Sequence, residues 1–143
     1  MKIPLDSSKL LERALADHAL ISQYTDSIGR MFGGGHAELV RAATETARQF
    51  LTKKLVQHFD YEEQQIFPAL LQPTVSETVR RLVLEIQDEH ESLLEEAQQL
   101  DKMLAAHEAG GDHEDSLRQA MLSFLQKLEK HSVKENELFP SML

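Results

Sequence analysis

The sequence contains no cysteine among its 143 residues. This absence excludes disulfides, thiolate zinc sites and cysteine-held iron–sulfur clusters. Because cysteine is absent, any metal that this chain binds must be held by histidine and carboxylate side chains. Glycine and proline are also scarce, with six and four residues respectively.

Clustered basic residues and long apolar runs are lacking as well. Acidic residues outnumber Lys and Arg by 24 to 15, which gives a formal net charge of −9. We therefore expect no nucleic-acid partner and no membrane partner, since both bind clustered cations. No apolar run approaches the roughly 18 residues of a membrane-spanning helix. The N-terminus lacks the apolar stretch of a secretory signal, so we expect a cytoplasmic protein.

The remaining composition predicts an all-α protein. The length is that of one domain, and we expect residues 1–143 to form a single domain. No stretch shows strand-like alternation, and glycines and prolines such as Pro73 and Gly110 divide the chain into four segments with helical periodicity. The expected helices cover residues 6–30, 36–70, 74–108 and 112–139. Short connections between them favour an antiparallel up-down-up-down four-helix bundle.

One face of each expected helix carries apolar residues interrupted by a histidine. In the fourth segment these residues follow steps of four and three, as in Leu128, His131, Glu135 and Leu138. The histidines on the other three faces are His18, His58 and His90. Glu62 follows His58 by four residues, as Glu135 follows His131, so each pair shares one helix face.

The centre of the bundle would thus hold four imidazoles and two carboxylates. A single histidine on an apolar face is usually a hydrogen-bonded core residue, but an unpaired buried carboxylate is costly. A metal ion removes that cost for all of these side chains at once. We therefore interpret the six residues as a metal site: His18, His58, Glu62, His90, His131 and Glu135.

The chain also repeats itself. The step from His18 to His58 is 40 residues and that from His90 to His131 is 41. The segment HFDYEEQQIFP after the second histidine is similar to HSVKENELFP after the fourth. Two copies of one helical hairpin, related by a pseudo-twofold axis, would give two metal positions with two histidines each and bridging glutamates. Such nitrogen and oxygen donors suit iron first, then manganese and zinc.

This doubled His, His-x-x-x-Glu and Phe-Pro pattern resembles the hemerythrin-like (HHE cation-binding) domain, over about residues 6–140. The resemblance implies a four-helix bundle with a non-haem di-iron centre. It implies that the four histidines are terminal ligands and that Glu62 and Glu135 bridge two iron ions, together with an oxo or hydroxo group. Manganese or zinc are possible substitutes for iron.

Two departures separate the chain from the oxygen-carrying hemerythrins. Leu94 stands where the carriers have a fifth histidine, and His131-x-x-x-Glu135 replaces their His-x-x-x-x-Asp motif. The resemblance is therefore closer to the four-His, two-Glu members, which are associated with sensing of iron or oxygen, nitric-oxide response and repair of iron centres. A smaller departure is that the second Phe-Pro comes one residue early, which leaves the end of the fourth helix open.

Two classes of function stay open at this point. The first is a protein that binds O2, nitric oxide, peroxide or iron for sensing, scavenging or iron handling, without being a respiratory oxygen carrier. The second is a di-iron redox enzyme that reduces peroxide, O2 or nitric oxide, or a ferroxidase-like enzyme. We expect a small diatomic ligand or iron as partner, and a monomer or weak homo-oligomer.

Other polar residues are weaker candidates. We interpret His36, His107 and His113 as solvated residues near turns, and Glu63 and Glu137 as solvent-facing. Packing is the preferred interpretation of Tyr24 and Tyr61 over a role beside the metals. The positions of the histidines along their helices leave two alternatives open. More residues lie between the start of the second helix and His58 than between His18 and the end of the first helix. Either part of residues 31–45 is irregular, or the second helix extends beyond its neighbour.

Overall fold

The computed structural model describes residues 7–34, 37–108 and 114–142, and every regular element within these ranges is helical. The elements are α1 (Ser7–Gly33), α2 (Ala37–Gln49), η1 (Phe50–Lys54), α3 (Leu55–Tyr61), η2 (Glu62–Ile66), α4 (Phe67–Leu70), α5 (Glu77–Glu108) and α6 (Glu114–Met142). Elements α2 to α4 follow one another without a break and form one stretch, in which η1 and η2 are π-helical turns. The prediction of four helical segments is confirmed.

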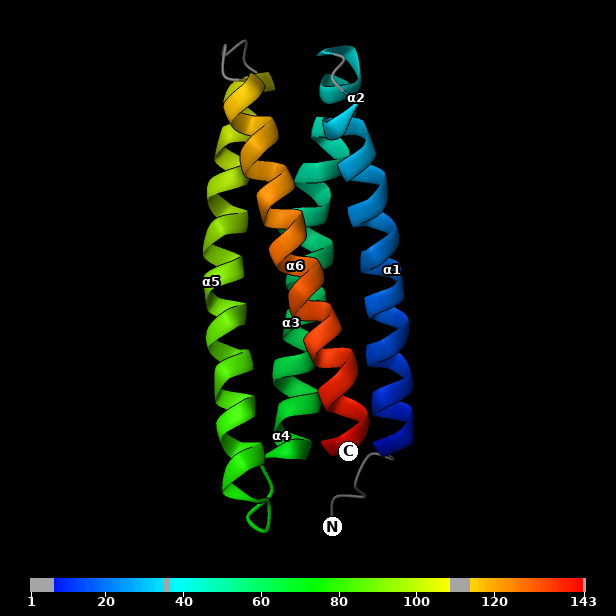
Figure 1. The fold of residues 1–143 in the computed structure, drawn as a ribbon, viewed down its shortest axis with the longest axis vertical. Helices are drawn as coiled ribbons and strands as arrows, with labels where there is room; N and C mark the ends of the chain where they lie inside the picture. Colours follow the sequence, from blue (N-terminus) through cyan, green and yellow to red (C-terminus); the bar gives the residue numbers. More distant parts are fainter. Residues whose placement is uncertain (1–6, 35–36, 109–113, 143) are drawn as a thin grey trace.

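The four helical stretches lie side by side along the long axis of the molecule (Figure 1). Contacts join α1 to α2 and α6, and α5 to α2 and α6. Each helix therefore presents an apolar face to its neighbours, as the three- and four-residue spacing predicts. Among the described residues, no helix is both long and apolar enough to cross a bilayer.

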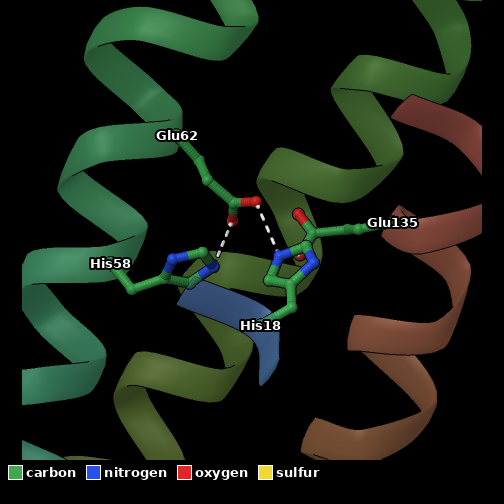
Figure 2. Close-up of side chains that lie close together, drawn as sticks. All are labelled: His18, His58, Glu62 and Glu135. Atoms are coloured by element: carbon green, nitrogen blue, oxygen red, sulfur yellow. Dashed lines mark hydrogen bonds and ion pairs between the residues drawn. The ribbon is translucent and has the colours of Figure 1, made fainter. Parts of the chain in front are cut away.

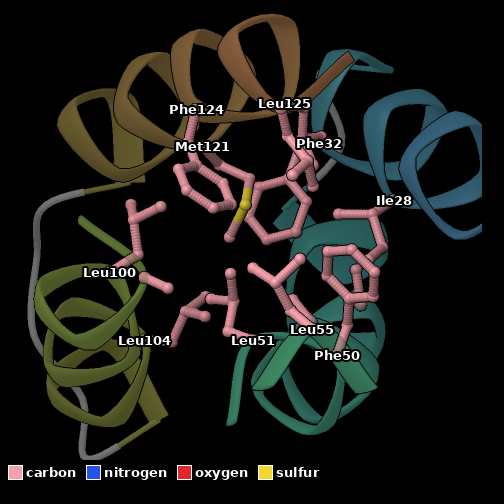
Figure 3. Close-up of a cluster of buried hydrophobic side chains, with 14 of the residues drawn as sticks. Ile28, Phe32, Phe50, Leu51, Leu55, Leu100, Leu104, Met121, Phe124 and Leu125 are labelled. Atoms are coloured by element: carbon pink, nitrogen blue, oxygen red, sulfur yellow. The ribbon is translucent and has the colours of Figure 1, made fainter. Parts of the chain in front are cut away.

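Buried apolar side chains form two separate clusters along this axis. The larger cluster includes Phe32 from α1, Leu51 and Leu55 from the second stretch, Leu104 from α5 and Phe124 from α6 (Figure 3). The smaller cluster includes Leu10, Ala14, Ile66, Phe67, Val83, Ile86 and Phe139. In α1, α5 and α6 the candidate histidine lies in sequence between the residues of one cluster and those of the other, and in the second stretch His58 directly precedes Phe59, the last residue of the larger cluster there. The polar residues therefore form a layer between two apolar ones.

The end of one helix differs from the expected bounds, at a proline. The fourth helix was expected to end at residue 139, but α6 continues through Pro140 to Met142. The second stretch also continues for two residues beyond a proline, Pro68, but it ends at Leu70, as expected. Both prolines lie in a last turn, where few further backbone hydrogen bonds depend on regular geometry.

The spacing of the histidines predicted either irregular backbone within residues 31–45 or a second helix that extends beyond its neighbour. The described part of residues 31–45 is helical apart from a turn at Gly34, and the irregular segment is η1, at Phe50–Lys54. The start of α2 also extends beyond the end of α1 in Figure 1. Extension of the second stretch and a π turn therefore both contribute to bringing His58 level with His18, and residues 35–36 lie outside the described ranges.

Candidate metal centre

The six candidate residues come from all four helical stretches and meet in one buried layer. His18 lies on α1, His58 on α3, Glu62 in η2 and His90 on α5, while α6 carries His131 and Glu135. Their exposed fractions range from 0% for both glutamates to 5% for His58. Figure 2 shows His18 from α1, His58 and Glu62 from the second stretch and Glu135 from α6 converging on one point.

The histidines of α1 and α5 each contact both carboxylates. His18 Nε2 lies 3.1 Å from Glu62 Oε2 and 3.1 Å from Glu135 Oε1. His90 Nε2 lies 3.2 Å from Glu135 Oε2 and 3.1 Å from Glu62 Oε1. Exchanging the two sequence repeats converts one set of contacts into the other, atom for atom.

The remaining two histidines follow the same symmetry. His58 Nε2 lies 3.2 Å from Glu62 Oε1, and His131 Nε2 lies 3.2 Å from Glu135 Oε1. These four atoms are buried and have no hydrogen-bond partner among the described residues, despite their short separations. An unsatisfied buried polar atom costs about 1–3 kcal/mol. A cation between such atoms would satisfy a nitrogen and an oxygen in each repeat.

The donor atoms separate into two groups that each could hold a metal ion. The His18/His58 group consists of His18, His58, Glu62 and Glu135, and the His90/His131 group consists of His90, His131 and the same two glutamates. Within each group, the ligand atoms all lie within 4.8 Å of one another. The residues therefore fit a metal site in which two carboxylates are shared.

Without metal, the layer is held by charged contacts. Burial disfavours the imidazolium of His18, but the carboxylates of Glu135 and Glu62 outweigh burial and raise its pKa to about 10. The same balance raises the pKa of His90 to about 9. Burial alone would raise the pKa of each glutamate, but the surrounding histidines lower both pKa values below 4.5. Protonated imidazoles thus supply the positive charge beside the carboxylates that metal cations would otherwise supply.

The π turn η2 explains the different spacing of the two Phe-Pro motifs. At about 100° per residue, Phe67 would lie about 180° around a regular helix from His58, whereas Phe139 lies about 80° from His131. The π turn at Glu62–Ile66 accommodates the extra residue. As a result, Phe67 and Phe139 meet with ring centroids 6.3 Å apart. The first repeat therefore has one residue more, and the second is the regular one.

Aromatic rings fix the histidine planes. Phe59 stacks on His90 with centroids 4.1 Å apart and an interplanar angle of 8°, and its edge meets His131 at 5.7 Å. The ring of Phe67 lies 5.3 Å from that of His90. These contacts restrict ring rotation and hold the inner nitrogens toward the carboxylates.

The outer nitrogen of each histidine contacts a further polar side chain. His18 Nδ1 lies 2.6 Å from Asn136 Oδ1, and His90 Nδ1 lies 3.2 Å from Glu63 Oε1. Glu63 keeps 37% of its side chain exposed, so the prediction that it faces solvent is only partly right. A one-residue step turns its side chain away from Glu62, but that direction leads to the neighbouring helix α5, where Gln87 also donates to it.

The outer partners of the other two histidines were missed as well. His58 Nδ1 lies 3.4 Å from Asp17 Oδ2, and His131 Nδ1 lies 2.7 Å from Glu89 Oε2. The repeat contained a signal for them, because an acidic residue directly precedes both His18 and His90. Such partners orient a ligand histidine and increase its donor strength.

The weaker candidates have other surroundings. Glu137 is exposed, as predicted. Tyr24 stacks on Phe50, and Tyr61 donates a hydrogen bond to the Leu10 carbonyl, so packing explains both tyrosines. The expectation that His107 is solvated is wrong, because the residue is half-buried near the end of α5 and both of its ring nitrogens are buried. His36 and His113 lie outside the described residues.

Surface cavities lead to three of the four histidines. A cavity of about 80 Å³ between α1 and α6 is lined by His18, and one of about 140 Å³ between α1 and the second stretch is lined by His58. A third, of about 390 Å³, lies between α5 and α6 and reaches His131. Water and other small molecules can therefore approach the layer from the side.

Comparison with known proteins gives no match, so the function is inferred from these residues. No family model, no curated protein and no solved structure matches the chain.

Proposed function

We propose that this chain is a hemerythrin-like, non-haem di-iron protein with an antiparallel up-down-up-down bundle. Its centre would bind or react with O2, nitric oxide, peroxide or iron, in sensing, scavenging or iron handling. The observation that carries the proposal is the buried, twofold-related set of four imidazoles and two carboxylates. Such a set of hard oxygen and borderline nitrogen donors suits iron.

The residues have distinct roles in this proposal. Each pair of histidines, His18 with His58 and His90 with His131, holds one metal position. Glu62 and Glu135 contribute to both donor groups. The outer side chains such as Glu63 orient the imidazoles. Iron bound there would supply one-electron redox chemistry and coordination positions for a small ligand. The lateral cavities beside His18, His58 and His131 suit diatomic or similarly small molecules.

Metal content tests the site itself. Protein purified with supplied iron is expected to hold close to two ions per chain, because two donor groups share the carboxylates. Glu62→Ala or Glu135→Ala should abolish the pair, since each substitution removes oxygens from both groups. Glu137→Ala is the matched control, because Glu137 is exposed on the same helix as Glu135. One ion or fewer in the intact protein would contradict the two-metal proposal.

A di-iron redox enzyme is the alternative, favoured by the cavities that reach the histidines. Stopped-flow spectra of the reduced protein mixed with O2, nitric oxide or peroxide separate the two functions. A stable coloured adduct supports binding, whereas multiple turnovers support an enzyme. If none of the three reagents changes the spectrum of the iron-loaded protein, iron handling is the function that remains.

A further inference from the structure

The outer partners of the histidines obey the same twofold symmetry as the ligands. Asp17 and Glu89 each directly precede the first histidine of a repeat, and they contact the second histidine. Glu63 and Asn136 each directly follow the shared glutamate of a repeat, and they contact the first histidine of the other repeat. Every outer position in one repeat therefore has its counterpart in the other.

Charge breaks this symmetry at one pair of positions. The acceptor on His90 Nδ1 is the carboxylate of Glu63, whereas the acceptor on His18 Nδ1 is the neutral amide oxygen of Asn136. A negatively charged acceptor polarises the imidazole more strongly and makes its inner nitrogen a better donor to a cation. His90 is therefore the stronger donor of the two.

The other pair of outer partners does not reverse this difference. Asp17 and Glu89 are both carboxylates, and the contact of Glu89 with His131 is the shorter, at 2.7 Å against 3.4 Å. Lys134 Nζ lies 2.8 Å from the other oxygen of Glu89, which fixes the carboxylate and offsets part of its charge. The short contact and the lysine act in opposite directions, so Glu63 and Asn136 carry the main asymmetry.

We infer that Glu63 and Asn136 make the two metal positions unequal, so that a divalent cation binds first and more tightly at the His90/His131 group. This inference rests on the proposed function, because it requires two positions. Both residues are positioning residues, since they act through His90 and His18. The inequality arises outside the ligands, in a set of ligands that is itself symmetric.

Zinc titration of the chelator-treated protein tests the inference. In calorimetry with a competing chelator, the unsubstituted protein is expected to bind two ions, with dissociation constants that differ by about tenfold, the lower end of known effects of outer partners. Glu63→Gln keeps an acceptor but removes the charge, so it should weaken the tighter step. Asn136→Asp adds the charge in the same shape, so it should strengthen the weaker step. Each variant should bring the two constants together.

Matched measurements separate this role from a structural one. Glu137→Gln removes an exposed charge beside Asn136 and should leave both constants unchanged. A structural role would weaken both steps in Glu63→Gln, whereas the inference requires selective weakening of one step and a gain in Asn136→Asp. The Mössbauer spectrum of the reduced, iron-loaded protein should show two distinct iron environments that become more alike in Asn136→Asp.

The possible outcomes distinguish the inference from the proposed function. Two ions bound with equal constants in the unsubstituted protein would overturn the inference and leave the function standing. Unequal constants that neither substitution changes would also overturn it. Binding of one ion or none would instead contradict the two-metal function.

Discussion

Phe59 packs its ring against three of the candidate histidines, His58, His90 and His131. It is 1% exposed and lies parallel to the ring of His90. Phe59→Ala should lower the free energy of unfolding of the metal-free protein by about 3–5 kcal/mol, because it removes a buried ring and leaves a cavity. Urea denaturation measures this loss. Phe59→Leu is the control for volume, and a loss below about 1 kcal/mol in the alanine variant would contradict the packing role.

Leu94 determines which oxygen chemistry we expect. It is half-buried against the larger apolar cluster, one turn beyond His90, and its side chain has no donor atom. In the proposed di-iron centre, neither metal position would then gain a third imidazole, so the reduced protein should be oxidised by O2 instead of releasing it. Cycles of oxygenation and vacuum should show progressive loss of the reduced form by absorption spectroscopy. A reversible spectrum over several cycles would make the protein an oxygen carrier.

Single residues were predictable where their burial has few explanations. Histidine and glutamate on an apolar helix face, as at His131 and Glu135, are costly unless they share a ligand, so their spacing predicted that they meet in one buried layer. Outer partners such as Glu63 and Asn136 lie where polar residues are common on any helix. Only the packing of neighbouring helices shows which of these polar residues reach a histidine.

At the scale of an element, the π turn η2 should allow one residue to be deleted without loss of stability. Removing Gln64, which is exposed, should convert the π turn to a regular helix and keep Phe67 on the inner face. Removing Glu137, which is also exposed, shortens a helix without an extra residue. Its deletion should rotate Phe139 by about 100° out of the core.

Thermal unfolding of the two deletion variants provides the measurement. The Gln64 deletion should melt close to the intact protein, and the Glu137 deletion should melt well below it. Equal destabilisation by both deletions would mean that η2 does not absorb an extra residue.

The helical segments themselves were predictable from periodicity, but a π turn leaves no signal in composition. The unequal spacing of Phe67 and Phe139 from their histidines predicted a difference at the end of the fourth helix, whereas the structure places the extra residue in η2.

At the scale of the whole molecule, metal should act as a ligand of the folded state alone. The donor atoms converge from four helical stretches that are far apart in sequence, so an unfolded chain offers no comparable site. A ligand present at a thousandfold excess over its dissociation constant adds about 4 kcal/mol to the free energy of unfolding. Calorimetric melting with and without zinc measures this gain. A metal-free form that melts within about one degree of the loaded form would contradict it.

Stability of the metal-free molecule should also depend on pH in a defined direction. The pKa of His18 is raised from 6.5 to about 10 and that of His90 to about 9, so their contribution is complete below pH 6.5 and is lost as pH rises through 9 to 10. The pKa values of Glu62 and Glu135 are lowered, so their contribution is present above pH 4.5 and is lost in acid. The metal-free protein should therefore be most stable between about pH 4.5 and 6.5.

Bound metal should remove the alkaline part of this dependence. A metal ion must displace the protons of His18 and His90, so its affinity rises as pH increases from 6.5 toward 9. The difference in unfolding free energy between loaded and metal-free protein should therefore widen over this interval in urea titrations. The double variant His18→Gln, His90→Gln is the control, and its metal-free form should lose much less stability over the same interval. A difference that stays constant from pH 6.5 to 9 would show that these two imidazoles are not protonated in the metal-free molecule.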